Sequence, residues 1–105
     1  MTALPSLDKE GHIENLADWN TQVAELIASQ ESVMLSQNHW LVIHALRAFY
    51  ADTDVSPAMR AFVNLVKQQC GEELGNSIAL MQLFGESPAK MAAKIAGLPK
   101  PTNCL

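Results

Sequence analysis

One segment of the chain, about residues 37–51, is apolar on almost every side of the helix that it predicts. Ser36 is a suitable N-cap for this helix. Only Gln37, His44 and Arg47 mark a narrow polar edge. A helix with so little polar surface is stable inside a core, so other helices have to surround it. We therefore expect a helical bundle with this segment at its centre. Its apolar residues are Trp40, Leu41, Val42, Ile43, Leu46, Phe49 and Tyr50.

Helical patterns also flank this segment on both sides. Val23, Leu26 and Ile27 follow the i, i+3, i+4 spacing of a helix with one apolar face. Ser56-Pro57 and Ser87-Pro88 each predict a helix start, a cap followed by proline at the first helical position. Glycines follow the last three segments and predict their ends. The predicted helices cover about residues 19–29, 57–70, 72–84 and 88–96.

The first fifteen residues predict a short β-hairpin. Asp8–Gly11 has the composition of a tight turn, with Asp at its first position and Gly at its last. The segments 3–7 and 12–15 on either side are too short for helices. Two strands alone are marginally stable, so the hairpin would have to pack on the helices.

The expected fold is therefore mainly α: a compact bundle of four to five helices, with a short N-terminal β-hairpin and an extended C-terminal arm. We expect a helical domain over residues 1–96 and an arm over residues 97–105. The 105 residues are 49% hydrophobic and 17% charged, which is typical of one folded domain. No apolar run approaches the roughly 20 residues of a membrane span, and the N-terminus lacks a basic-then-apolar leader. These features predict a cytoplasmic protein without a membrane partner.

The arm combines two prolines with a thiol near its end. Pro99 and Pro101 exclude a helix and favour extended backbone, which rises about 3.1 Å per residue. Cys104 would then lie roughly 20–25 Å from Gly97. A cysteine near a chain end can be incidental, because termini tolerate change. It can equally be a thiol that reaches into the active site of another protein, and this is our leading hypothesis for Cys104.

The other candidate residues favour structural roles. Cys70 ends an apolar helix and is expected to be a small buried hydrophobe. His39 and His44 are five residues apart, which does not place them side by side on a helix. We find no metal-ligand spacing, phosphate loop or nucleophile elbow, and expect neither metal nor cofactor.

One alternative function is a DNA-binding regulator. Arg60, Asn64 and Lys67 share one face of the predicted third helix, which could belong to a helix-turn-helix-like unit. The formal net charge of −4 argues against direct nucleic-acid binding, which depends on neutralising phosphates.

The C-terminal sequence resembles that of the DsrC/TusE family. The specific motif is the stretch from Lys94 to Leu105, KIAGLPKPTNCL. Weaker matches extend over nearly the whole chain, including Asp8–Gly11, His39-Trp40 and Ser56-Pro57-Ala58. The family resemblance implies a small helical protein whose penultimate cysteine, Cys104 here, carries sulfur as a persulfide.

The resemblance also implies partners. Members that use two arm cysteines work with dissimilatory sulfite reductase, and the second cysteine falls at Ala93 here. The single-cysteine pattern is similar to TusE-type members, sulfurtransferases that relay sulfur toward 2-thiouridine in tRNA. The implied donor is a TusBCD/DsrEFH-like complex, and the implied acceptor is a tRNA thiolase or a sulfite reductase. A DsrC-like role in dissimilatory sulfur metabolism stays open as the alternative.

Two departures from the family pattern concern the partner surface and the arm. Family members commonly carry aromatic and basic residues after the Gly-Asn-Ser segment, where this chain has Ile78, Ala79, Met81 and Gln82. Asn103 stands where glycine often precedes the arm cysteine, and asparagine tolerates positive φ better than most residues.

Overall fold

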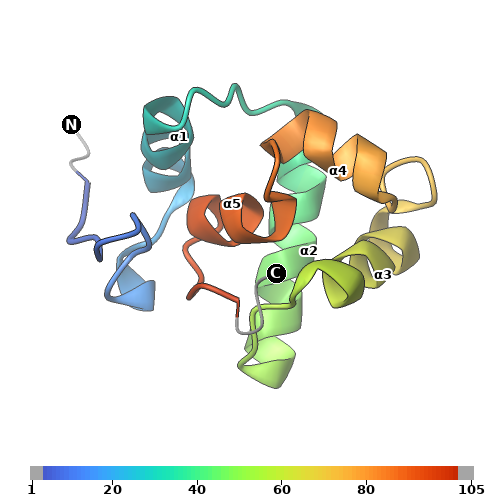
Figure 1. Cartoon of the computed structure of the whole chain (residues 1–105). Coiled ribbons are helices and arrows are strands. Elements are labelled where there is room, and N and C mark those ends of the chain that lie inside the picture. Colours follow the sequence, from blue (N-terminus) through green and yellow to red (C-terminus); the bar gives the residue numbers. More distant parts are fainter. Residues whose placement is uncertain (1–3, 102–105) are drawn as a thin grey trace.

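A computed structural model describes residues 4–101, and within that range the fold is helical, as the sequence predicts (Figure 1). A 3₁₀ turn, η1, precedes five α-helices. Cys104 lies outside the described residues. None of the described helices is both long enough and apolar enough to cross a bilayer. The elements are η1 (Leu16–Asp18), α1 (Thr21–Gln30), α2 (Gln37–Thr53), α3 (Met59–Cys70), α4 (Ser77–Phe84) and α5 (Pro88–Ile95).

The centre of the molecule is α5, and the prediction that residues 37–51 would be buried all round is wrong. The helix α5 crosses α2 and contacts each of the four other α-helices (Figure 1). In α2 the buried residues are confined to one face, and Leu41 is 45% exposed. Alanines explain the position of α5, because small side chains allow neighbouring helices to approach closely. The buried alanines near its axis are Ala89, Ala92, Ala93 and Ala96.

The helix starts confirm one Ser-Pro signal and correct the other. Ser87 is the N-cap of α5, and proline occupies the first turn as predicted. Ser56 does not cap α3, whose N-cap is Ala58. Its hydroxyl instead donates a hydrogen bond to the carbonyl of Pro99. The starts of α1 and α4 lie later than predicted, because the side chains of Asn20 and Asn76 accept the first free N–H groups.

The predicted N-terminal β-hairpin is also wrong, since the described residues contain a single antiparallel bridge, Leu7 to Ile13, and no strand. The chain does reverse direction at Asp8–Gly11. A ladder would pair the His12 N–H with the Asp8 carbonyl, but the Asp8 carboxylate accepts that N–H at 3.0 Å. The Asp8 carbonyl instead accepts a hydrogen bond from the Gly11 N–H. Side-chain capping therefore replaces the ladder.

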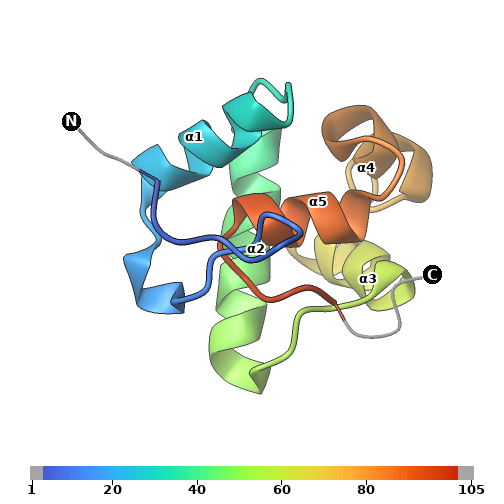
Figure 2. The ribbon, with the colours of Figure 1, turned by 60° about the vertical axis from the view of Figure 1, so that its left-hand side comes forward.

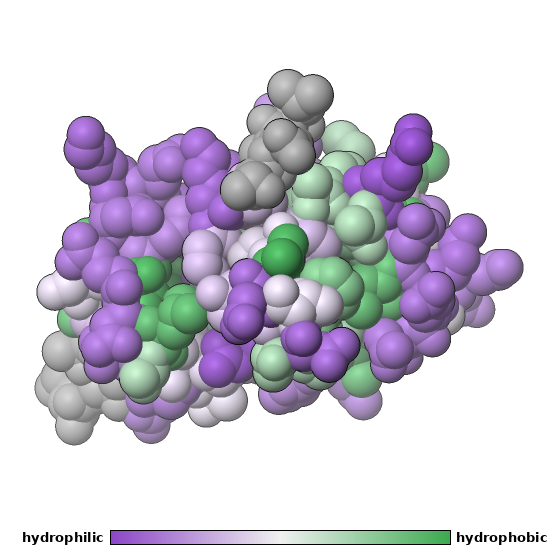
Figure 3. Space-filling view, turned by 90° about the horizontal axis from the view of Figure 1, so that it is seen from below, coloured by the Kyte–Doolittle hydropathy of each residue, from purple (hydrophilic) through white to green (hydrophobic). Residues whose placement is uncertain are grey.

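This N-terminal loop lies next to α5 and to the segment that follows it (Figure 2). Residues distant in sequence thus meet at the C-terminal end of α5. Seen from below, polar surface predominates, and apolar patches interrupt it on both sides of the centre (Figure 3).

Candidate functional site

The described part of the arm is held against the helices by hydrogen bonds to its backbone. We call residues 95–101 the arm base. Four of its carbonyls each accept a hydrogen bond from a side chain of a different part of the chain. The bonds join Trp19 Nε1 to Ile95 at 2.9 Å, Arg47 Nη1 to Ala96 at 2.6 Å, His12 Nδ1 to Leu98 at 3.0 Å, and Ser56 Oγ to Pro99 at 2.6 Å.

The path of the arm base depends on Gly97. After α5 ends, the Gly97 N–H donates to Lys94 and the Leu98 N–H donates to Ala93, the two bonds of a Schellman motif. Gly97 has a φ of +74°, and an added Cβ would lie 2.2 Å from Trp19 Cδ1. Only glycine combines this backbone conformation with such a close approach. The predicted glycine stop is therefore confirmed, and it also turns the chain beneath Trp19.

Arg47 joins α2 to the arm base. Its guanidinium lies 3.8 Å from the centroid of the Trp19 ring, within range of a cation–π contact. Partial burial lowers the pKa of Arg47 from its ordinary value. Sequence reasoning placed Arg47 on the polar edge of its helix and missed this role. A guanidinium within an otherwise apolar helix was the available signal, because such a group needs a partner when it is buried.

His12 is the most enclosed polar residue of the site. Its side chain is 1% exposed, and because the Leu98 carbonyl can only accept, Nδ1 carries the proton. Its Nε2 is buried without a hydrogen-bond partner among the described residues. No local sequence pattern indicates this role, because His12 falls within the expected hairpin.

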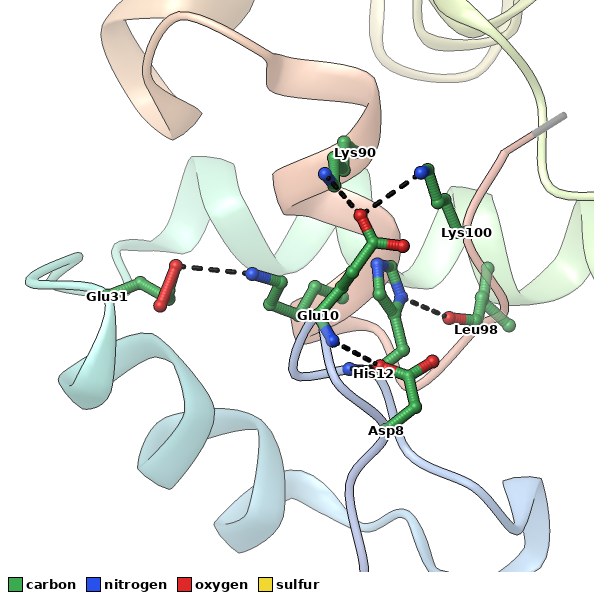
Figure 4. A network of polar contacts seen from close by, with 8 residues as sticks. Asp8, Glu10, His12, Glu31, Lys90, Leu98 and Lys100 are labelled. Atoms are coloured by element: carbon green, nitrogen blue, oxygen red, sulfur yellow. Dashed lines mark hydrogen bonds and ion pairs between the residues drawn. The ribbon is translucent and has the colours of Figure 1, made fainter. Parts of the chain in front are cut away.

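An ion cluster covers the outer side of this contact (Figure 4). Lys90 and Lys100 both contact the same carboxylate oxygen of Glu10, at 2.9 Å and 3.1 Å. These two ammonium groups lower the pKa of Glu10 to about 2. Lys100 belongs to the arm base and Lys90 to α5, so the N-terminal loop ties the arm base to the helix. Nearby, Lys94 contacts Glu31 at 3.3 Å.

The remaining candidate residues lie apart from the arm base. Cys70 is partly buried against the core rather than enclosed within it, and its Sγ lies 3.7 Å from the Leu41 carbonyl oxygen. Burial raises the pKa of this thiol, which disfavours the reactive thiolate. His44 is exposed and stacks on Trp40. Within residues 4–101 no cluster of three or more His, Cys, Asp or Glu side chains could hold a metal ion.

The face predicted for DNA binding is exposed. Arg60, Asn64 and Lys67 all lie at the surface of α3. None of the four side chains that hold the arm base comes from this helix. The structure therefore does not bring the two candidate sites together.

Comparison with known proteins gives concordant results. The family model described as "DsrC like protein" matches residues 3–105. Sulfurtransferase TusE of Sodalis glossinidius is 51% identical over 100 residues, which cover 95% of this chain and 93% of that protein. Sulfurtransferase TusE of Yersinia pseudotuberculosis is 46% identical over 98 residues, covering 93% of this chain and 91% of that protein.

Solved structures agree with these sequence matches. The NMR structure of Allochromatium vinosum DsrC superposes with a TM-score of 0.86 at 42% identity, covering 94% of this chain and 88% of that one. The oxidized gamma-subunit of dissimilatory sulfite reductase (DsrC) from Archaeoglobus fulgidus gives a TM-score of 0.83 at 33% identity, covering 96% and 92%.

Proposed function

Because this chain belongs to the DsrC-like family, we propose that it acts as a sulfurtransferase that carries sulfane sulfur as a persulfide on Cys104. The observation that carries this proposal is the anchored arm base. Cys104 follows the buried Pro101 by three residues, so its Cα lies within about 11 Å of the Pro101 Cα. A thiol on such a short tether cannot lie far from the face of the helical domain at which the arm base ends.

The chemistry needs only the thiol and a persulfide donor. The Cys104 thiolate attacks the outer sulfur of a donor cysteine persulfide, and a new S–S bond forms as the donor's S–S bond breaks. The donor leaves as a thiolate, so sulfur moves without net oxidation or reduction. The same exchange, now with the Cys104 persulfide as the donor, passes the sulfur to an acceptor. Because the thiolate is the nucleophile, the rate depends on its population and on access to it.

The residue at the position of the family's second arm cysteine argues for a relay that uses one cysteine. Ala93, where two-cysteine members of the family have their second arm thiol, is buried in α5 and its carbonyl accepts the Leu98 N–H. No intramolecular disulfide with Cys104 can form there. This departure favours sulfur relay toward tRNA 2-thiouridine over the alternative role with a sulfite reductase.

The proposed partners follow from this relay. A TusBCD/DsrEFH-like complex would supply the persulfide, and a tRNA thiolase would accept it. Since the tRNA substrate is cytoplasmic, the relay would operate in the cytoplasm.

The experiment that tests this function is mass spectrometry of the full chain after incubation with a persulfide donor. We expect Cys104 to gain about 32 Da, the mass of one sulfur atom, and to lose it on treatment with a reducing thiol. Cys70→Ala is the matched control and should load like the parent. Equal loading of Cys104→Ala and the parent would contradict the proposal.

A further inference from the structure

A groove opens between α3, α4 and the first turn of α5, next to the arm base. Its volume is about 390 Å³. The neighbouring helix α4 contains no charged residue, and Ile78 and Met81 are 70% and 45% exposed. Large apolar side chains exposed beside a groove indicate a surface that another molecule covers. The groove is lined by Met59, Met81, Pro88 and Ala89, with Glu86, Ser87, Lys90 and Lys100 at its polar side.

Building on the proposed sulfur-transfer function, we propose that this groove is the docking surface for the protein that donates persulfide sulfur to Cys104. The groove receives an apolar side chain that lies next to the reactive cysteine of that protein. Met81 and Met59 form the flexible part of the apolar wall, and methionine adapts its shape to an incoming side chain.

The length of the chain beyond the arm base supports this location. Lys100 lines the groove, and Cys104 follows it by only four residues. Sulfur transfer requires the partner's cysteine to reach bonding distance of Cys104. A specific interface buries roughly 800 Å² on each protein, far more than the last few residues supply. The partner therefore also covers the surface beside the arm base, and the groove is the apolar part of that surface.

The charges around the groove favour an apolar contact over a polyanion. Lys90 and Lys100 share the Glu10 carboxylate, and Glu86 adds a second carboxylate to the lining. These carboxylates offset the two lysines, so a nucleic-acid backbone gains little here. A protein surface gains instead from covering Ile78 and Met81.

The test is a comparison of sulfur transfer kinetics in the full chain. The variant is Met81→Glu, and the matched control is Leu41→Glu, because Leu41 is also 45% exposed but lies on α2 outside the groove. One donor is a persulfidated complex of the TusBCD type, and the other is the small molecule glutathione persulfide. Ile78→Glu serves as a second variant, on the exposed face of α4 and outside the groove lining, and circular dichroism confirms that each variant folds.

For the protein donor, we expect Met81→Glu and Ile78→Glu to raise KM about tenfold with little change in kcat, since they remove binding and not chemistry. Leu41→Glu should stay within about twofold of the parent. Loading from glutathione persulfide should be the same in all variants.

Two results would overturn the docking proposal. One is a KM for both α4 variants equal to that of Leu41→Glu. The other is a changed loading rate from glutathione persulfide in the α4 variants alone, which would assign the groove to the chain's own C-terminal segment. Failure of the parent to load Cys104 from either donor is a separate outcome, which refutes the proposed function and the docking surface together.

Discussion

Two buried histidines hold two different parts of this molecule, and only one of them has both ring nitrogens hydrogen-bonded. His39 accepts the Ser36 N–H at Nδ1, at 3.0 Å, so its Nε2 carries the proton and donates to the Leu83 carbonyl at 2.6 Å. Its ring also meets Phe84 edge-on, with centroids 5.0 Å apart. His12 donates to the Leu98 carbonyl, and its Nε2 has no partner among residues 4–101.

The difference separates a structural contact from a positioning contact. His39 completes the capping of α2 and links the start of that helix to the end of α4. His12 carries the cost of an unpaired buried nitrogen, about 1–3 kcal/mol, and yet holds the arm base. Departures from complete hydrogen bonding concentrate at functional sites, where position matters more than stability. We therefore expect the two histidines to respond differently to substitution.

The largest effect is expected at His39. His39→Ala removes the partners of the Ser36 N–H and of the Leu83 carbonyl and leaves a cavity beside Phe84. We expect the free energy of unfolding to fall by about 3 kcal/mol, measured by urea denaturation. The control is His44→Ala, because His44 is exposed and should change stability by less than about 0.5 kcal/mol. Equal losses in the two variants would contradict a structural role for His39.

A smaller global effect is expected at His12. His12→Ala removes one hydrogen bond and leaves a cavity, but it also removes the unpaired nitrogen, so the free energy of unfolding should fall by about 2 kcal/mol, less than for His39→Ala. The arm base should open locally, with amide exchange at Leu98 about tenfold faster than that loss of global stability alone predicts. His39→Ala is the reference, since its exchange at Leu98 should follow its global stability. If His12→Ala matches His39→Ala in both measurements, the distinction between the two residues is wrong.

Local sequence patterns predicted the features that depend on neighbouring residues. The apolar periodicity located the helices, Ser87-Pro88 marked the start of α5, and Gly97 marked its end. Each of these signals acts within one helical turn, where the sequence determines which backbone groups need partners. The family resemblance implied the role proposed for Cys104, which local patterns left open between a functional and an incidental thiol.

The contacts of the arm base could not be predicted in this way. His12 and Leu98 are 86 residues apart in sequence, Arg47 and Ala96 are 49 apart, and Ser56 and Pro99 are 43 apart. The Ser56 hydroxyl illustrates the difficulty, because the local Ser-Pro pattern indicates a helix cap. Which acceptor a hydroxyl finally meets depends on the packing of distant segments. The same limit explains the hairpin, where the Asp8 side chain competes with the backbone ladder.

The smallest effect on stability is expected from a substitution in the ion cluster over His12. The ammonium groups of Lys90 and Lys100 lower the pKa of Glu10 to about 2, from its ordinary value of 4.5. A carboxyl whose folded-state pKa is depressed stabilises the fold above its unfolded pKa, and this contribution is lost as the pH falls through the folded pKa. The midpoint of urea unfolding should therefore be lower for Glu10→Gln than for the parent near pH 7. This difference should shrink between about pH 4.5 and pH 2.

The control for this prediction is Glu14→Gln. Glu14 is exposed on the same N-terminal segment, and no ion pair of the described residues includes it. Its substitution should leave the unfolding midpoint and its pH dependence close to those of the parent. Because Glu10 is exposed, salt near 1 M should also reduce the difference between Glu10→Gln and the parent. A difference that persists unchanged at pH 2 and in high salt would mean that Glu10 acts through packing, and the cluster would then not reinforce the contact between His12 and the arm base.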